Sequence, residues 1–180
     1  MRMRKKKHLD ERLEKCDNII VLHSEDSNFQ TAIEKKEFID TQALFGNDNP
    51  VVLEIGCGKG NFACELAKRN PDINVLALEK SANVLVIACE KAMKNNIKNV
   101  KFIHSGAEYI EKYIEPESIE RIYLNFSCPY PKKAYENRRL TNIRFLKSYD
   151  VLLKKGAEIH QKTDNMHFCN KLCERGGIAK

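Results

Sequence analysis

The sequence predicts an α/β fold in which helices cover both faces of a mostly parallel sheet. From residue 51 onward, short apolar segments alternate with amphipathic ones, and a glycine-rich turn directly follows the first apolar segment. Alternation of this kind implies parallel strands joined by right-handed crossovers. A chain of 180 residues with 42% hydrophobic content is long enough for one such domain. We expect it to span residues 49–180, after a polar, highly charged segment, residues 1–48, that reads as a basic arm and an irregular lead-in.

The individual elements follow from local patterns. Residues 51–55 form a short apolar run, and residues 61–69 place Phe62, Ala63 and Leu66 on one helical face. The same strand–helix alternation then continues along the chain. The expected strands are residues 51–55, 74–79, 100–104, 121–126 and 158–163, and the expected helices are 61–69, 82–95, 107–113 and 138–153.

Three glycines, Gly56, Gly58 and Gly60, follow the first strand directly. Small residues at this point let the backbone approach a ligand at the carboxyl end of the sheet, beside a helix N-terminus. A tight strand-to-helix turn without a ligand is the alternative. The dinucleotide fingerprint places its third glycine one position later, where this chain has Asn61. The spacing therefore favours S-adenosylmethionine over NAD.

Two carboxylates accompany the glycine loop. Glu79 ends the second strand, 23 positions after Gly56, where it can accept hydrogen bonds from both hydroxyls of a ribose. Glu54 lies just before the loop and can receive an ammonium group. An ordinary solvated carboxylate is the alternative for Glu79, but the strand context makes a nucleoside cofactor the better interpretation.

Charge and cysteine content limit the possible partners. The chain has 31 Lys and Arg against 25 Asp and Glu, a net charge of +6, which favours a polyanionic partner such as nucleic acid. No apolar run approaches the length of a membrane span. The seven cysteines include no CxxC pair, so the sequence suggests neither a disulfide framework nor a metal site, and a cytoplasmic setting is expected.

Residues 122–133, IYLNFSCPYPKK, run from an apolar strand into a basic loop with two prolines. This pattern indicates the mouth of an active site with Cys128 at its centre. Cys128 could be a covalent nucleophile, as in C5 methylation of a base, but no adjacent general base is evident. An inert, packed cysteine is the other alternative.

Together these residues resemble the bacterial tRNA (guanine-N7)-methyltransferases. The resemblance implies a Rossmann-like class I methyltransferase fold. It rests on the segments 1–4 (MRMR), 45–50 (FGNDNP), 53–60 (LEIGCGKG), 70–72 (NPD), Glu79, 121–127 (RIYLNFS), 129–133 (PYPKK), 138–141 (RRLT) and 162–165 (KTDN).

The resemblance also implies roles for single residues. The cofactor, S-adenosylmethionine, would be held by Glu54, Glu79 and the glycine loop, with Gly106 and Ala107 near the adenine. Lys132 and Asp164 match positions that engage the tRNA substrate. A solvated lysine and a helix N-cap are the alternatives for those two residues.

The implied reaction needs little from acid–base chemistry. Guanine N7 carries a free lone pair that can attack the sulfonium methyl in line, so catalysis would depend mainly on positioning. In an A-form helix N7 faces a groove that side chains cannot read, so the base must be distorted or extruded. Lys132, Lys133, Arg138, Arg139 and the basic arm are candidate phosphate contacts.

Three features depart from the family pattern. Cys128 stands where the family has an aspartate, with Tyr130 in place of a tryptophan, and Gly106 replaces a cofactor-side aspartate. The sequence also lacks the family's last two strands, so we expect the final strand to be a sheet edge. A largely neutral thiol cannot replace a carboxylate that pairs with guanine N–H groups, a loss of about 1–3 kcal/mol. We expect weakened methylation; a tRNA-binding relative without catalysis is the alternative.

Overall fold

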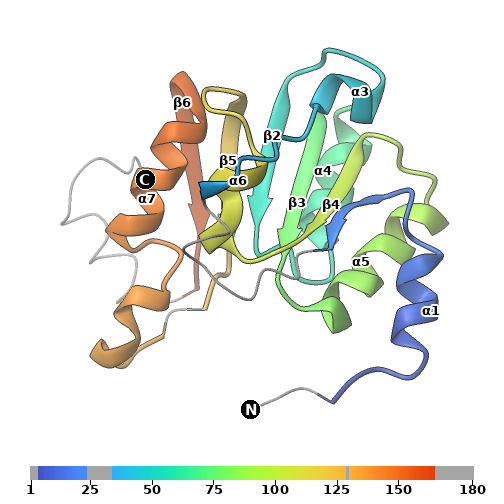
Figure 1. The fold of residues 1–180 in the computed structure, drawn as a ribbon, viewed down its shortest axis with the longest axis horizontal. Helices are drawn as coiled ribbons and strands as arrows, with labels where there is room; N and C mark the ends of the chain where they lie inside the picture. The colour runs from blue at the N-terminus through green and yellow to red at the C-terminus, as the bar shows by residue number, and fades with distance from the viewer. Residues whose placement is uncertain (1–3, 24–33, 129, 165–180) are drawn as a thin grey trace.

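The computed structural model describes residues 4–23, 34–128 and 130–164 (Figure 1). In this part of the chain six strands form one sheet in the order β1-β4-β3-β2-β5-β6, and every neighbouring pair is parallel. The strands are β1 Ile20–His23, β2 Val51–Ile55, β3 Asn74–Glu79, β4 Val100–His104, β5 Ile119–Asn125 and β6 Leu153–Lys162. This arrangement confirms the α/β fold with a mostly parallel sheet.

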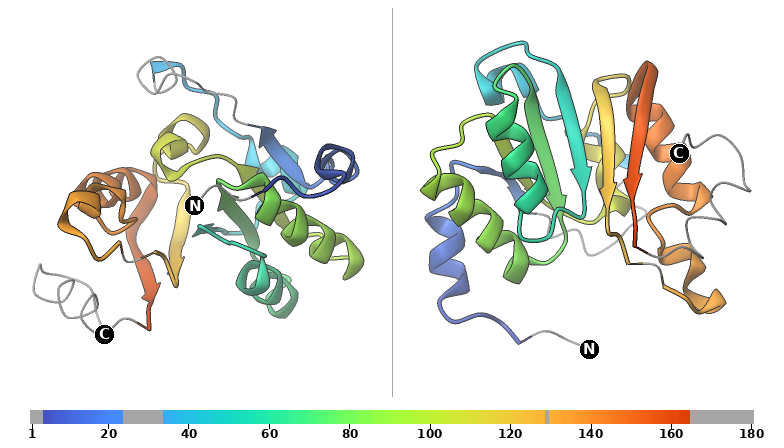
Figure 2. Two further views of the ribbon diagram at one scale, coloured as in Figure 1. Left: turned by 90° about the horizontal axis from the view of Figure 1, so that it is seen from below. Right: turned by 180° about the vertical axis from the view of Figure 1, so that it is seen from behind.

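Helices cover both faces of the sheet, as Figure 2 shows from below. One face packs against α1 and the two helices α4 and α5, and the other packs against α6 and α7. Along β2, Val52 faces the first group while Leu53 and Ile55 face the second, so alternation along a fully buried strand serves both cores. The helices are α1 Leu9–Glu14, α3 Thr41–Phe45, α4 Asn61–Arg69, α5 Ala82–Lys94, η1 Ala107–Tyr109, α6 Ile110–Tyr113, η2 Lys133–Arg138 and α7 Ile143–Leu152.

The predicted strands at 51–55, 74–79 and 100–104 have the observed bounds, whereas β6 begins at Leu153 rather than at residue 158. Its pairing with β5 shifts register between Ile119 and Arg121, and Gly156 adopts a positive φ of 83° inside the strand. This irregularity hides the first half of β6 from a simple periodic pattern. The expected helix at 138–153 is shorter, because Asn142 caps the start of α7 and the preceding residues form η2.

The sequence did not predict β1. This strand pairs with β4 at one edge of the sheet, and the preceding helix α1 packs against α5. The Arg12 guanidinium of α1 donates two hydrogen bonds to the Glu90 carboxylate of α5, at 2.6 and 2.7 Å. At the opposite end of the described sheet, β6 is the last strand. None of the helices in the described ranges is long and apolar enough to span a membrane.

Candidate active site

The site lies at the point where the chain changes direction across the sheet. From β2 the chain proceeds to β3 on one side, and β5 later adds to the other side of β2. The carboxyl ends of β2 and β5 are therefore followed by loops that diverge, which is where open α/β sheets bind ligands. In Figure 1 these ends are the arrowheads at the lower edge of the sheet.

The glycine loop after β2 needs its glycines for different reasons. Gly56, Gly58 and Gly60 all have positive φ, between 56° and 78°. A Cβ at Gly60 would lie 2.6 Å from the Cβ of Ala88, so this glycine permits α4 to approach α5. A Cβ at Gly58 would meet nothing within 4 Å. The space beside the loop at Gly58 is therefore open.

Glu79 lies at the end of β3, next to this loop. One of its carboxylate oxygens accepts a hydrogen bond from the Gly58 N–H at 3.0 Å, and the other accepts from the Ser81 N–H at 2.8 Å. A carboxylate has about four acceptor sites, so both oxygens retain capacity for further donors. The half-buried Glu79 thus fixes the loop and can still accept from a pair of hydroxyls.

Glu54 is a buried carboxylate, 2% exposed, one residue before the end of β2. Its Oε1 accepts from the Asn125 amide of β5 at 3.1 Å, but its Oε2 has no hydrogen-bond partner among the described residues. Burial raises the pKa of Glu54, and the nearby Glu79 adds to the rise, while Asn125 and the backbone of Ala63 oppose it. A buried acceptor without a donor is costly, and an ammonium group would remove that cost.

These features fit S-adenosylmethionine. The open side of Gly58 admits a close approach, Glu79 offers acceptors for ribose hydroxyls, and the unpartnered Glu54 oxygen suits the ammonium of the methionine part. Within the described residues, no group of three or more His, Cys, Asp or Glu side chains is placed to hold a metal ion.

The end of the segment after β5 approaches the first residue of the glycine loop. A Cβ at Gly56 would lie 3.6 Å from Cδ1 of Leu140, which places the end of this segment in contact range of the first glycine. Phe126, at the end of β5, has a φ of 49° and a side chain that is 58% exposed. Cys128 follows two residues later with an exposed thiol, and no described residue forms a hydrogen bond with it.

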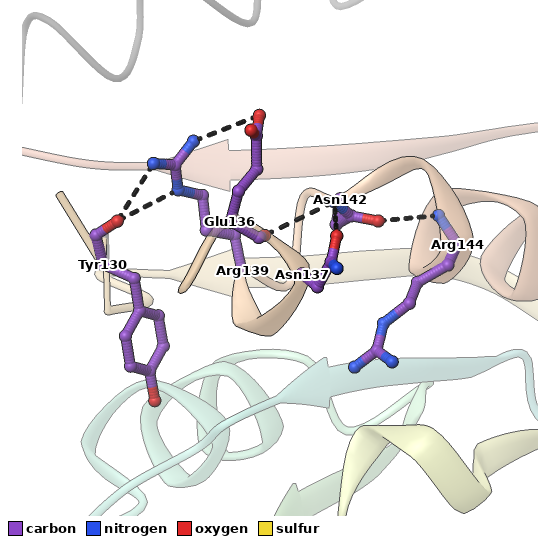
Figure 3. Close-up of polar contacts among 6 residues, drawn as sticks. All are labelled: Tyr130, Glu136, Asn137, Arg139, Asn142 and Arg144. Carbon is purple, nitrogen blue, oxygen red and sulfur yellow. Dashed lines mark hydrogen bonds and ion pairs between the residues drawn. The ribbon is translucent and has the colours of Figure 1, made fainter. Parts of the chain in front are cut away.

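Arg139 holds the same loop together from inside (Figure 3). Its guanidinium donates two hydrogen bonds to the carbonyl of Tyr130 and lies 3.5 Å from the Glu136 carboxylate. The Arg139 side chain is only 12% exposed, so it is committed to the loop. Two of the other predicted phosphate contacts, Arg138 and Lys132, are exposed.

The remaining predicted residues lie along the same edge of the sheet. Lys132 is exposed at the start of η2, and Asp164 is exposed two residues beyond β6, whose Lys162 pairs with Asn125. The helix that Asp164 was expected to cap lies outside the described residues. Ala107 is buried at the start of η1, after β4.

Gly106 is also buried after β4, and a neighbour fills the space beside it. A Cβ at this position would lie 2.4 Å from Oε2 of Glu108. No pattern in the sequence identified Glu108, because the contact depends on how η1 turns. Leu140 and Asn125 each belong to a motif of the family resemblance, but the sequence did not predict their contacts.

Comparison with known proteins identifies the family. Residues 48–178 match a family described as "Putative methyltransferase". A tRNA (guanine-N(7)-)-methyltransferase of Listeria monocytogenes serotype 4a is 41% identical over 165 residues, which cover 92% of this chain and 72% of that protein. This chain belongs to the tRNA (guanine-N7)-methyltransferase family.

A second relative agrees with this assignment. The protein of the same name from Bacillus subtilis is 47% identical over 122 residues, 68% of this chain. That alignment spans 57% of the Bacillus protein, so the rest of that protein lies outside the aligned region. The family assignment confirms the resemblance found in the sequence.

Solved structures agree on the fold. An antibiotic-related methyltransferase superposes with a TM-score of 0.55 at 16% identity, covering 87% of this chain and 78% of that one. Phosphoethanolamine N-methyltransferase 2 of Haemonchus contortus, solved with S-adenosyl-L-methionine, gives a TM-score of 0.50 at 20% identity, covering 75% and 31%. At such identities these proteins share only the fold, which is the class I S-adenosylmethionine-dependent one.

Proposed function

We propose that this chain transfers a methyl group from S-adenosylmethionine to N7 of a guanine in the variable region of tRNA, in the cytoplasm. The observation that carries the proposal is that the family match, residues 48–178, includes the loops that follow β2 and β5 on either side of the switch point. The names of the relatives support the choice of substrate.

The chain supplies a site for the cofactor through three groups. S-adenosylmethionine, when bound, provides an electrophilic methyl on a sulfonium. Glu54 offers its unpartnered carboxylate oxygen to the ammonium, Glu79 offers acceptors to the ribose, and the backbone at Gly58 leaves room for both. Asn125 fixes the orientation of the Glu54 carboxylate from the neighbouring strand. These residues position the ligand at the mouth of the β5 loop.

Positioning of the guanine accounts for most of the catalysis that we propose. N7 needs no base to remove a proton, so the protein has to hold the ring in line with the methyl. Lys132 and Arg138 on the β5 loop are exposed cations for the tRNA phosphates, and Asp164 is an exposed acceptor at the end of the neighbouring strand.

The basic arm extends the same surface. The Lys6 N–H donates to the Asn83 side chain at 2.8 Å, and the Asn83 amide donates to the Arg4 carbonyl at 3.2 Å. Asn83 is near the start of α5, directly after β3, so the arm is tied to the carboxyl edge of the sheet; in Figure 1 it runs below the arrowheads. Arg4 and Lys6 are exposed there.

Cys128 favours a second candidate function, a tRNA-binding protein without turnover. A thiol is a weaker hydrogen-bond acceptor for guanine N–H groups than a carboxylate, and this thiol is exposed beside the proposed site. Loss of one such contact corresponds to about ten- to a hundredfold in rate, which weakens methylation without abolishing the positioning by other residues.

The test is methyl transfer from labelled S-adenosylmethionine to unmodified tRNA, with the wild type, Cys128→Asp and Cys128→Ser compared. We expect slow transfer by the wild type, no gain with serine and a gain of about tenfold or more with aspartate. A tRNA whose variable-region guanine is replaced by adenine is the control and should receive no label. Salt-sensitive tRNA binding with no transfer by any variant would support the second candidate and refute the first.

A separate trapping experiment tests a covalent role of Cys128. No described residue forms a hydrogen bond with the thiol, so the described part of the chain places no general base against it. We expect no protein–RNA adduct with 5-fluoropyrimidine-containing tRNA, which traps C5 methyltransferases. An adduct that disappears in Cys128→Ser would establish the nucleophile.

A further inference from the structure

Glu108 places a carboxylate beside the predicted cofactor site, where the chain leaves β4. Its Oε2 lies 2.4 Å, its Cδ 2.5 Å and its Oε1 2.8 Å from the position that a Cβ of Gly106 would take. The oxygens of an aspartate carboxylate lie at a similar distance from their own Cβ. The Glu108 carboxylate therefore lies as close to this position as the carboxylate of an aspartate at position 106 would.

Lys80 holds this carboxylate toward the neighbouring strand. The Lys80 Nζ lies 2.8 Å from Oε1 of Glu108, and Lys80 directly follows Glu79, the last residue of β3. In the sheet, Glu79 is paired with His104 at the end of β4. The Lys80–Glu108 pair thus bridges the two loops that follow β3 and β4, next to the carboxylate proposed to bind the ribose.

Glu108 is ionised at neutral pH. Burial opposes ionisation, but the hydrogen bond from Lys80, the backbone at Glu108 and the charges of Lys80 and Arg144 together lower the pKa of Glu108. Its side chain is 26% exposed, against 74% for Lys80, so the carboxylate is sheltered while the ammonium faces solvent. Because Lys80 contacts Oε1, Oε2 can accept from a ligand.

We infer that Glu108 is a cofactor-specificity residue that accepts a hydrogen bond from the exocyclic amine of adenine, in the place that Gly106 leaves vacant. The inference rests on the proposed function, because it assumes that the ligand is an adenosine. An adenine presents its 6-amino group as a donor, whereas hypoxanthine presents a carbonyl oxygen, which a carboxylate repels. Glu108 would then select adenosine over inosine.

The experiment measures binding of S-adenosylhomocysteine and S-inosylhomocysteine by calorimetry, without tRNA. For the wild type we expect S-inosylhomocysteine to bind about tenfold or more weakly. In Glu108→Gln an amide can rotate to donate to the oxygen, so the two dissociation constants should differ by less than about threefold. Glu111→Gln, three positions later on α6, is the matched control and should keep the wild-type ratio.

A double variant distinguishes a direct contact from a structural role. Gly106→Asp combined with Glu108→Ala returns a carboxylate to the same space without the clash, and we expect it to restore discrimination against S-inosylhomocysteine. If the wild type binds S-adenosylhomocysteine but Glu108→Gln keeps the wild-type ratio, the inference is wrong and the proposed function stands. If the wild type binds neither compound, the proposed function fails together with the inference.

Discussion

The guanidinium of Arg139 donates two hydrogen bonds to the carbonyl of Tyr130, from Nε at 3.3 Å and from Nη2 at 3.0 Å. Tyr130 has a φ of 40°, a conformation that is unfavourable for a residue with a side chain. This contact closes a loop of eight intervening residues, which include Lys132 (Figure 3). Arg139 therefore stabilises the shape in which the loop presents its substrate-facing residues.

Replacement of Arg139 by alanine should loosen the β5 loop. We expect faster amide hydrogen exchange across residues 130–139 and a loss of about tenfold or more in kcat/KM for tRNA, because a charged hydrogen-bond donor is removed from a strained turn. The dissociation constant of S-adenosylmethionine should change by less than about twofold. Arg138→Ala is the matched control: this exposed side chain lies over the Tyr135 ring, and its loss should reduce the salt dependence of tRNA binding without altering exchange. Unchanged exchange in Arg139→Ala would show that the contact does not order the loop.

Replacement of Glu54 by glutamine should separate cofactor binding from stability. Because burial raises the pKa of Glu54 above its unfolded value, ionisation of this group destabilises the ligand-free protein once the pH rises above the ordinary glutamate range. Glutamine keeps the acceptor for Asn125 and removes the charge. We expect a higher Tm than the wild type at pH 7, a difference that shrinks toward about pH 4, and an affinity for S-adenosylmethionine that falls about tenfold or more.

Thermal melts of both proteins across this pH range, with and without S-adenosylmethionine, provide the measurement. Glu115→Gln, an exposed residue before β5, is the control and should show neither effect. A lower Tm for Glu54→Gln at pH 7, combined with unchanged affinity, would mean that the carboxylate has an internal partner in solution.

Alanine at two glycines of the loop should separate an effect on stability from an effect on cofactor binding. Gly60→Ala should lose about 2–4 kcal/mol of unfolding free energy, since the new Cβ would collide with Ala88 in addition to the cost of a positive φ. Gly58→Ala adds only the backbone cost, about 1–2 kcal/mol, but projects a methyl into the open side of the loop and should weaken S-adenosylmethionine binding.

Gly46→Ala is the matched control for the backbone cost. Gly46 has a φ of 71° with nothing within 4 Å of its Cβ position, and it ends α3, so the variant should lose the same stability as Gly58→Ala and keep full affinity. Urea unfolding and calorimetric binding check the three variants. Equal stability of Gly60→Ala and Gly58→Ala would contradict the close approach of α4 and α5.

The Arg12–Glu90 pair should make the attachment of α1 sensitive to acid. The hydrogen bond from Arg12 is the main cause that lowers the pKa of Glu90 below its unfolded value, so its contribution is present above the ordinary glutamate range and is lost as the pH falls. The side chains of Arg12 and Glu90 are 30% and 43% exposed, so solvent screens the attraction between their charges. We expect Arg12→Met to cost about 0.5–1 kcal/mol at pH 7 and nothing at about pH 3. Arg69→Met, which removes the more exposed i,i+4 pair with Glu65, is the control and should cost less.

The sequence by itself determined the central part of the fold. Apolar runs of five or six residues and a helix with a 3.6-residue period are local signals, so β2, α4, β3 and β4 were predicted with their observed bounds. The placement of Glu54 and Glu79 at one edge of the sheet was also predictable, because the carboxyl ends of adjacent parallel strands lie at the same edge.

Only the tertiary structure decided which side chains meet across distant segments. Three contacts depend on loop conformations. They are the close approach of Gly60 to Ala88, the hydrogen bonds from Arg139 to the Tyr130 carbonyl, and the position of the Glu108 carboxylate beside Gly106. Such contacts leave no periodic trace in the sequence, because they arise from the packing of elements and from the local turn of the backbone. The pairing of β1 with β4 was missed for the same reason: a four-residue strand at a sheet edge is specified by the surface it joins and not by its own pattern.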